Sequence, residues 1–196
     1  MRTQILIWLS YFCISILNPI LAATPEKVVK RMVNAIKLKK FSDNLTEKEL
    51  EHNRKMVRIA AESFDIESMG KAALDKHWDT LDAARREELL DKIKELIIKL
   101  AYPAKSDVVG NIQVIYKNQQ VEHDKARVNT LVIIKEKELK IDYLLHFTEN
   151  NQWLIYDVLS SDRSLIEDYR KQFDKIISTY SIDKLFELLD KKLNSQ

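Results

Sequence analysis

Trp153–Phe173, WLIYDVLSSDRSLIEDYRKQF, is the stretch of the sequence that decides the fold. Its first part, Trp153–Leu159, is rich in aromatic and β-branched residues, which is typical of a strand. A polar turn follows, and Ser164 with Glu167 forms the pattern of a capping box at the start of a helix. Apolar residues then recur at helical spacing: Leu165, Ile166, Tyr169, Phe173, Ile176 and Ile177. The stretch therefore predicts a strand that leads through a short turn into an amphipathic helix.

Three more strand-like runs precede this stretch, and short polar linkers separate them: Asn111–Lys117, Ala126–Lys135 and Leu139–Phe147. Apolar and polar residues alternate in the last run, so that Leu139, Ile141, Tyr143, Leu145 and Phe147 share one face. By the same alternation we expect Asp157 to share a face with Trp153 and Ile155. Short linkers favour hairpins. We therefore expect a four-stranded curved antiparallel sheet.

The chain before the sheet has the signals of helices. Thr24-Pro25 is a cap followed by a proline at the first helical position, and Thr46–Glu49 is a capping box. Phe64-Asp65 precedes a short helix, and a long apolar stripe from Leu89 to Leu100 predicts another helix. A last helix is expected over Ile182–Leu193. Helices, then four strands, then helices predict an α+β fold, with helices packed on one face of the sheet.

The N-terminus has the features of a secretory signal peptide. A short basic start, Met1-Arg2, precedes an apolar run over Ile5–Leu17, and small residues end at Ala23. We expect residues 1–23 to be cleaved and residues 24–196 to form one domain. The alternative is an uncleaved membrane anchor. Because Cys13 is the single cysteine, the mature chain would contain no disulfide, thiolate nucleophile or cysteine metal ligand.

The sequence contains no catalytic or metal-binding motif. Its two glycines, Gly70 and Gly110, exclude a phosphate-binding loop, a dinucleotide fingerprint and a nucleophile elbow. The four histidines lack metal-ligand spacing, and a net charge of +2 does not indicate a nucleic-acid partner. A small enzyme that uses Asp157 with a tyrosine remains an alternative. We expect no catalytic residues, no metal, no cofactor and no enzymatic activity.

An ordered set of short motifs resembles a known family. The set comprises Phe64-Asp65, Met69-Gly70, Ala73-Leu74, His77-Trp78, Ile141-Asp142-Tyr143, Trp153, Tyr156-Asp157-Val158, Ser164-Leu165, Tyr169-Arg170 and Phe173. In order and spacing it is similar to the periplasmic phospholipid-binding proteins typified by MlaC, the toluene-tolerance auxiliary component. The turn Ser160–Arg163 departs from the family pattern, because Asp162 and Arg163 stand where glycine and an apolar residue are usual.

The resemblance implies a soluble periplasmic carrier with a phospholipid as ligand. Such a carrier moves lipid between an outer-membrane lipoprotein complex and an inner-membrane ABC transporter with a lipid-binding periplasmic subunit, and thereby maintains outer-membrane lipid asymmetry. We expect a monomer whose headgroup lies in water at the pocket mouth, with weak headgroup selectivity. The alternatives are a carrier of another lipid, such as a hopanoid, and an exported adaptor with a filled core.

The predicted lipid pocket lies between the sheet and the helices, because both offer apolar faces there. The residues that we expect to line it come from two strands and from the helix after the turn: Ile141, Tyr143, Leu145, Phe147, Trp153, Ile155, Tyr169, Phe173 and Ile176. We expect Arg170 to form a structural salt bridge and Asp157 to be hydrogen-bonded to the turn or to Arg170.

Overall fold

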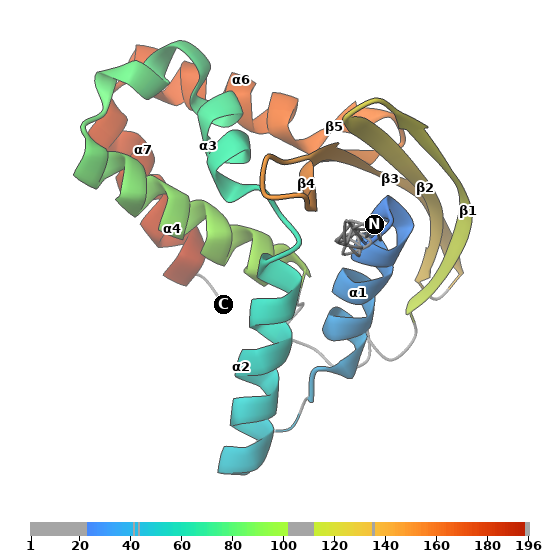
Figure 1. Cartoon of the computed structure of the whole chain (residues 1–196). Coiled ribbons are helices and arrows are strands. Elements are labelled where there is room, and N and C mark those ends of the chain that lie inside the picture. The colour runs from blue at the N-terminus through green and yellow to red at the C-terminus, as the bar shows by residue number, and fades with distance from the viewer. Residues whose placement is uncertain (1–22, 41, 43, 102–111, 135, 195–196) are drawn as a thin grey trace, which may run out of the picture.

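The computed structural model describes residues 23–40, 42, 44–101, 112–134 and 136–194, and its fold is α+β (Figure 1). The predicted signal peptide lies outside these residues, apart from Ala23. The helices are α1 (Pro25–Leu38), α2 (Glu47–Ala61), α3 (Ile66–Leu74), the 3₁₀ helix η1 (Asp75–Thr80), α4 (Ala83–Ala101), α6 (Leu165–Thr179) and α7 (Ile182–Asn194). The strands are β1 (Ile112–Glu122), β2 (Lys125–Ile134), β3 (Lys137–Phe147), β4 (Trp153–Ser160) and β5 (Arg163–Ser164).

The strands form one open antiparallel sheet in the order β1-β2-β3-β4-β5, and it curves around α1 (Figure 1). The prediction of four strands was therefore wrong by one. Ser161 and Asp162 adopt φ angles of 51° and 64°, which fold the chain back so that Arg163 and Ser164 pair with the end of β4. Two-residue turns of this kind usually contain glycine or asparagine, so the sequence carried no hairpin signal here.

The first strand is longer than its apolar pattern indicates. We expected it to end at Lys117, but β1 runs to Glu122 and pairs with β2 as far as Lys125. Four of the five added residues, 118–122, are polar and all five are exposed, so no burial pattern marks them as a strand. Backbone hydrogen bonds to β2 hold them in place, and the turn at His123–Asp124 closes the hairpin.

A β-bulge in β4 changes the face on which Asp157 lies. Leu145 pairs with Ile155, whereas Leu144 pairs with Asp157, so Tyr156 is an extra residue in the strand. The expectation that Asp157 and Ile155 share a face was therefore wrong. An inserted residue reverses the alternation of side chains beyond it, and Asp157 consequently points away from the core that α1 covers.

Two separate apolar cores support the fold. The sheet cluster lies between α1, α2 and the inner face of the sheet, and its buried members are Val29, Met32, Val33, Ala35, Met56, Ala60, Ala126, Val128, Tyr143, Leu145 and Ile155. The helical cluster joins α3, η1, α4, α6 and α7, and its buried members are Ala73, Leu74, Trp78, Leu81, Leu89, Ile93, Leu96, Phe173, Leu185, Phe186 and Leu189. Helices α3 and α6 of this cluster contact β4, and Figure 1 shows them beside that edge of the sheet.

The segment between α2 and α3 joins the two cores. Ile155 of β4 donates its N–H to the carbonyl of Ser63 at 2.8 Å and accepts from the N–H of Asp65 at 2.8 Å. Phe64 lies between them and forms a parallel bridge with Ile155. Asp65 also accepts a hydrogen bond from the Ser68 N–H as the cap of α3. These bonds explain why Phe64-Asp65 precedes the short helix.

The helix starts that the sequence predicts are confirmed. The Thr24 side chain caps α1, and Thr46 and Glu49 form the reciprocal capping box of α2. Ser164 caps α6 by accepting from the Glu167 N–H, but the Glu167 carboxylate binds Arg170. Among the described residues, none of the helices combines the length and apolar character needed to cross a membrane.

We predict that Gly70→Val destabilises the protein by about 1–3 kcal/mol, because overpacking a filled core strains it. Gly70 is buried on α3, and a Cβ atom there would lie 2.5 Å from Leu90 Cδ2 and 3.4 Å from Ile93 Cδ1. Chemical denaturation measures the change. The matched control is Ala72→Val on the exposed side of the same helix. Equal stability losses in the two variants would contradict close α3–α4 packing.

Candidate functional site

The predicted pocket residues of the strands lie in or against the sheet cluster. Leu145 and Ile155 have no exposed surface, and Tyr143 is 8% exposed. Burial raises the pKa of the Tyr143 phenol, which therefore stays protonated. Ile141 and Trp153 pack against the cluster. The Phe147 ring lies tilted against that of Trp153, with 5.2 Å between their centroids.

The predicted pocket residues of α6 lie in the other core. Phe173 is buried in the helical cluster, and Tyr169 and Ile176 pack against it. The rings of Tyr169 and Phe173 are 5.5 Å apart. The structure therefore brings the strand residues together and the helix residues together, but it places the two sets in different clusters.

A small apolar slot separates α3, α4 and α6. Its lining residues are Met69, Ala73, Ile93, Leu96, Ile97, Leu165, Ile166, Tyr169 and Phe173. Its volume is about 20 Å³, which accommodates about one water molecule. In this conformation the slot has no room for an acyl chain.

Two larger clefts flank α2. The first has a volume of about 520 Å³ between α2, α3 and α4, and it is lined by Arg54, Val57, Arg58, Ala61, Glu62, Ile66, Glu67, Leu90, Asp91, Lys94 and Ile98. The second has a volume of about 450 Å³ between α1 and α2, and it is lined by Lys27, Lys30, Arg31, Asn34, Ala35, Leu38, Met56 and Ile59. Sequence reasoning missed both, because their lining comes mostly from helix positions where charged residues are ordinary.

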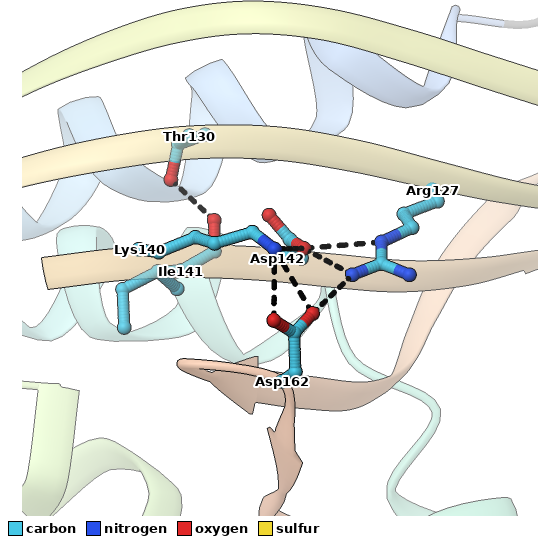
Figure 2. Close-up of polar contacts among 6 residues, drawn as sticks. All are labelled: Arg127, Thr130, Lys140, Ile141, Asp142 and Asp162. Atoms are coloured by element: carbon cyan, nitrogen blue, oxygen red, sulfur yellow. Dashed lines mark hydrogen bonds and ion pairs between the residues drawn. The ribbon is translucent and has the colours of Figure 1, made fainter.

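The polar turn before α6 is tied to the sheet through Asp162 (Figure 2). Lys140 donates to both Asp162 oxygens at 2.9 and 3.0 Å, and Arg127 donates to one of them at 3.0 Å. The hydrogen bonds from Lys140 and Arg127 lower the pKa of Asp162. The residue that departs from the family pattern is thus an anchor that holds the turn against β2 and β3.

Asp142 extends this network into the protein. It is 1% exposed, and its Oδ2 accepts hydrogen bonds from two nitrogens of Arg127. Its Oδ1 has no hydrogen-bond partner among the described residues. Lys140 Nζ lies 3.9 Å from the same Oδ2 and does not hydrogen-bond to it. The buried carboxylate therefore depends mainly on Arg127, because an unpaired buried charge is costly.

Asp157 has a structural role at the start of α6. Its Oδ2 accepts from the Ser164 hydroxyl at 2.6 Å, and its Oδ1 accepts from the N–H groups of Val158 and Ile166 at 2.8 and 3.2 Å. The prediction of a hydrogen bond to the turn is confirmed. Both oxygens are thus engaged in joining β4 to α6.

Arg170 forms a structural salt bridge, as predicted. It donates to both oxygens of Glu167 at 2.8 Å and to Asp75 at 3.2 Å. The hydrogen bonds from Arg170 and Lys171 lower the pKa of Glu167 to about 2. This pairing ties the first turns of α6 to the start of η1.

Two of the histidines contact an aspartate. His77 contacts Asp174 at 2.8 Å, and His146 contacts Asp65 at 2.7 Å. Within the described part of the chain, no three histidine, cysteine, aspartate or glutamate side chains are placed to hold a metal ion.

The chain thus has an open, curved antiparallel sheet beside a helical bundle, with apolar residues on the inner sheet face. Residues 26–191 match the family model described as MlaC protein, and the chain belongs to the MlaC family. A comparison with curated protein sequences finds no match.

The fold is similar to that of a phospholipid-binding protein from Ralstonia solanacearum, whose structure was determined in complex with a phospholipid. The two chains are 20% identical with a TM-score of 0.67, and the match covers 86% of this chain and 93% of the other. The likeness therefore extends over both the sheet and the helices.

We predict that Arg127→Leu destabilises the protein by about 3–5 kcal/mol, because it leaves the Asp142 carboxylate buried without its main partner. Adding Asp142→Leu should restore most of this loss, since a buried apolar pair needs no charge partner. Denaturant unfolding of the single and double variants measures both effects. A double variant no more stable than Arg127→Leu would show that the ion pair is unimportant.

We also predict that Glu167 makes the stability of the folded protein depend on pH. Its folded pKa of about 2 lies below its ordinary value of 4.5, so the folded state gains stability above pH 4.5 and loses it as the pH falls towards 2. The melting temperature of the wild type should exceed that of Glu167→Gln at neutral pH, and the difference should disappear near pH 2. Glu138→Gln, at an exposed position of β3, is the control. A difference that does not change with pH would contradict this assignment.

Proposed function

We propose that the protein is a soluble phospholipid carrier. Its membership of the MlaC family over nearly the whole domain carries this proposal. The phospholipid bound to the Ralstonia solanacearum protein, which shares the fold across 93% of its length, supports it.

The physical need for a carrier follows from the hydrophobic effect. Two acyl chains carry about 30 methylene groups, and exposing each to water costs about 0.8 kcal/mol, or about 24 kcal/mol in all. A phospholipid therefore does not cross an aqueous compartment unaided. A protein that shields the chains replaces one apolar environment by another, so exchange with a bilayer is nearly balanced.

The acyl chains are proposed to lie between the sheet cluster and the helical cluster. The predicted pocket residues lie on the two sides of this boundary, with Trp153 and Ile155 on one and Tyr169 and Phe173 on the other. The slot beside Tyr169 and Phe173 lies within the helical cluster and has a volume of about 20 Å³, so it does not hold an acyl chain. Loading is proposed to occur by a movement of the two clusters apart. The bonds of Ile155 to Ser63 and Asp65 are a hinge about which such a movement can occur.

The proposal includes the route of the lipid. Residues 1–23 act as a cleaved signal peptide, and residues 24–196 function in the periplasm as a monomer. The carrier exchanges lipid with an inner-membrane ABC transporter that has a lipid-binding periplasmic subunit and with an outer-membrane lipoprotein complex. This exchange maintains outer-membrane lipid asymmetry. The N-terminal sequence pattern and the family support this route.

The carrier is proposed to have no enzymatic activity. The enzyme alternative requires Asp157 as its catalytic acid or base. Both Asp157 oxygens are hydrogen-bonded at the start of α6, which supports a structural role for this residue instead. One observation favours a different function, an exported adaptor with a filled core: Leu145, Ile155 and Val128 have no exposed surface. A hopanoid in place of the phospholipid is a further alternative.

We predict that phospholipid copurifies with the native protein and that the delipidated protein takes labelled phospholipid from vesicles. Solvent extraction followed by mass spectrometry identifies the lipid, and transfer from labelled vesicles measures uptake. If a hopanoid is recovered, the ligand is a hopanoid and not a phospholipid. If no lipid is recovered and none is taken up, the carrier function is wrong and the adaptor is favoured.

Two half-buried positions test the pocket: Trp153→Gln and Ile176→Gln. In a carrier, each polar side chain meets the acyl chains and should reduce lipid uptake about tenfold, with a smaller effect on unfolding. Val121→Gln is the control, because Val121 is 52% exposed on the sheet edge. If the variants lose stability but keep full uptake, the pocket lies elsewhere.

A further inference from the structure

The cleft between α2, α3 and α4 lies where the two cores meet. Val57 of α2 and Ile98 of α4 pack against the sheet cluster, whereas Ile66 of α3 and Leu90 of α4 pack against the helical cluster. These side chains give the cleft an apolar lining, and its volume of about 520 Å³ is within the range of small-ligand sites. The cleft therefore opens above the boundary at which we place the acyl chains.

Charged residues of both signs line the cleft. Arg54 and Arg58 come from α2, Glu67 from α3, and Asp91 and Lys94 from α4. Asp91 and Lys94 are three residues apart, so their side chains are neighbours on one face of α4.

Four of the charged groups around the cleft are available to a ligand. Arg54 is paired with Glu47 at 2.7 Å, and Glu62 is paired with Arg31 at 2.9 Å, both outside the cleft. In contrast, the side chains of Arg58, Lys94, Glu67 and Asp91 make no hydrogen bond or ion pair within the described part of the chain. The available charges are thus two cations and two carboxylates in one cleft.

We propose that this cleft binds the headgroup of a zwitterionic phospholipid with a phosphate and a primary ammonium group. Arg58 and Lys94 bind the phosphate, and Glu67 and Asp91 bind the ammonium. The glycerol and the first methylenes then lie on Val57, Ile66 and Leu90 on the way to the boundary between the cores. This inference rests on the proposed phospholipid carriage and names the lipid class.

The spacing and charge of the cleft favour this headgroup over an anionic one. Asp91 and Lys94 are three residues apart, which separates their Cα atoms by about 4.5 Å along the helix axis. A phosphate and an ammonium joined by two methylenes can bridge such a pair. An anionic headgroup would meet the same cations but would leave Glu67 and Asp91 beside added negative charge. Because the site is exposed, the preference should be modest, about three- to tenfold.

The test compares uptake of phosphatidylethanolamine and phosphatidylglycerol with identical acyl chains, each from vesicles in which it is the labelled minor component. The wild type should take up phosphatidylethanolamine about three- to tenfold better. Asp91→Asn and Glu67→Gln should reduce this preference, whereas Arg58→Gln and Lys94→Gln should reduce uptake of both lipids. The controls are Glu95→Gln on α4 and Lys71→Gln on α3, which are exposed and do not line the cleft.

Circular dichroism and melting temperatures identify any variant that fails to fold. In that case the isosteric Asp91→Asn variant decides whether the cleft sets the headgroup preference. Equal uptake of the two lipids by the wild type, or an unchanged preference in Asp91→Asn, would overturn the headgroup site and leave the carrier function intact. Uptake of neither lipid would overturn both. Displacement of bound lipid by micromolar glycerophosphoethanolamine, which has no tails, would instead make the cleft a site for small phosphoesters and contradict the proposal.

Discussion

The backbone of one residue, Ile155, holds the two halves of the protein together. Its N–H and carbonyl bond to Ser63 and Asp65, and its side chain is fully buried in the sheet cluster. Two residues later, Asp157 caps α6, so the same strand positions helices from both ends of the chain. The segment between α2 and α3 and the start of α6 both bond to β4, so the relative placement of the two cores depends on this strand.

The apolar interior is divided into two clusters, and the boundary between them is where the proposed opening would occur. Each cluster is closed by its own side chains, while the boundary between them is crossed by the short segment at Phe64 and by contacts such as those of α2 with α4. A ligand that enters at this boundary need not disrupt either core. The charged cleft lies at this boundary and is the proposed headgroup site. The turn before α6 is instead held to the sheet by the bond between Lys140 and Asp162, which restrains the start of α6.

Local sequence signals predicted most of the fold. Caps and apolar spacing located α1, α2, α3, α4, α6 and α7, because these signals act within one turn of a helix. The errors have non-local causes: β5 depends on two non-glycine residues with positive φ, and the face of Asp157 depends on a bulge at Tyr156. For the site, alternation found the apolar residues but not their division between two cores. The cleft of Arg58 and Asp91 was invisible, because it arises only when α2, α3 and α4 meet.

The polar end of β1 has a consequence for the protein's behaviour in solution. Lys117–Glu122 are the second half of β1, the outer strand of the sheet; all six are exposed, and all but Val121 are polar or charged. An outer strand offers unpaired backbone groups to other chains, and polar or charged side chains discourage such pairing. In the proposed carrier, opening the apolar interior would expose surface that can join two copies. Because five of these six edge residues are polar or charged, edge-to-edge pairing of such open molecules is disfavoured.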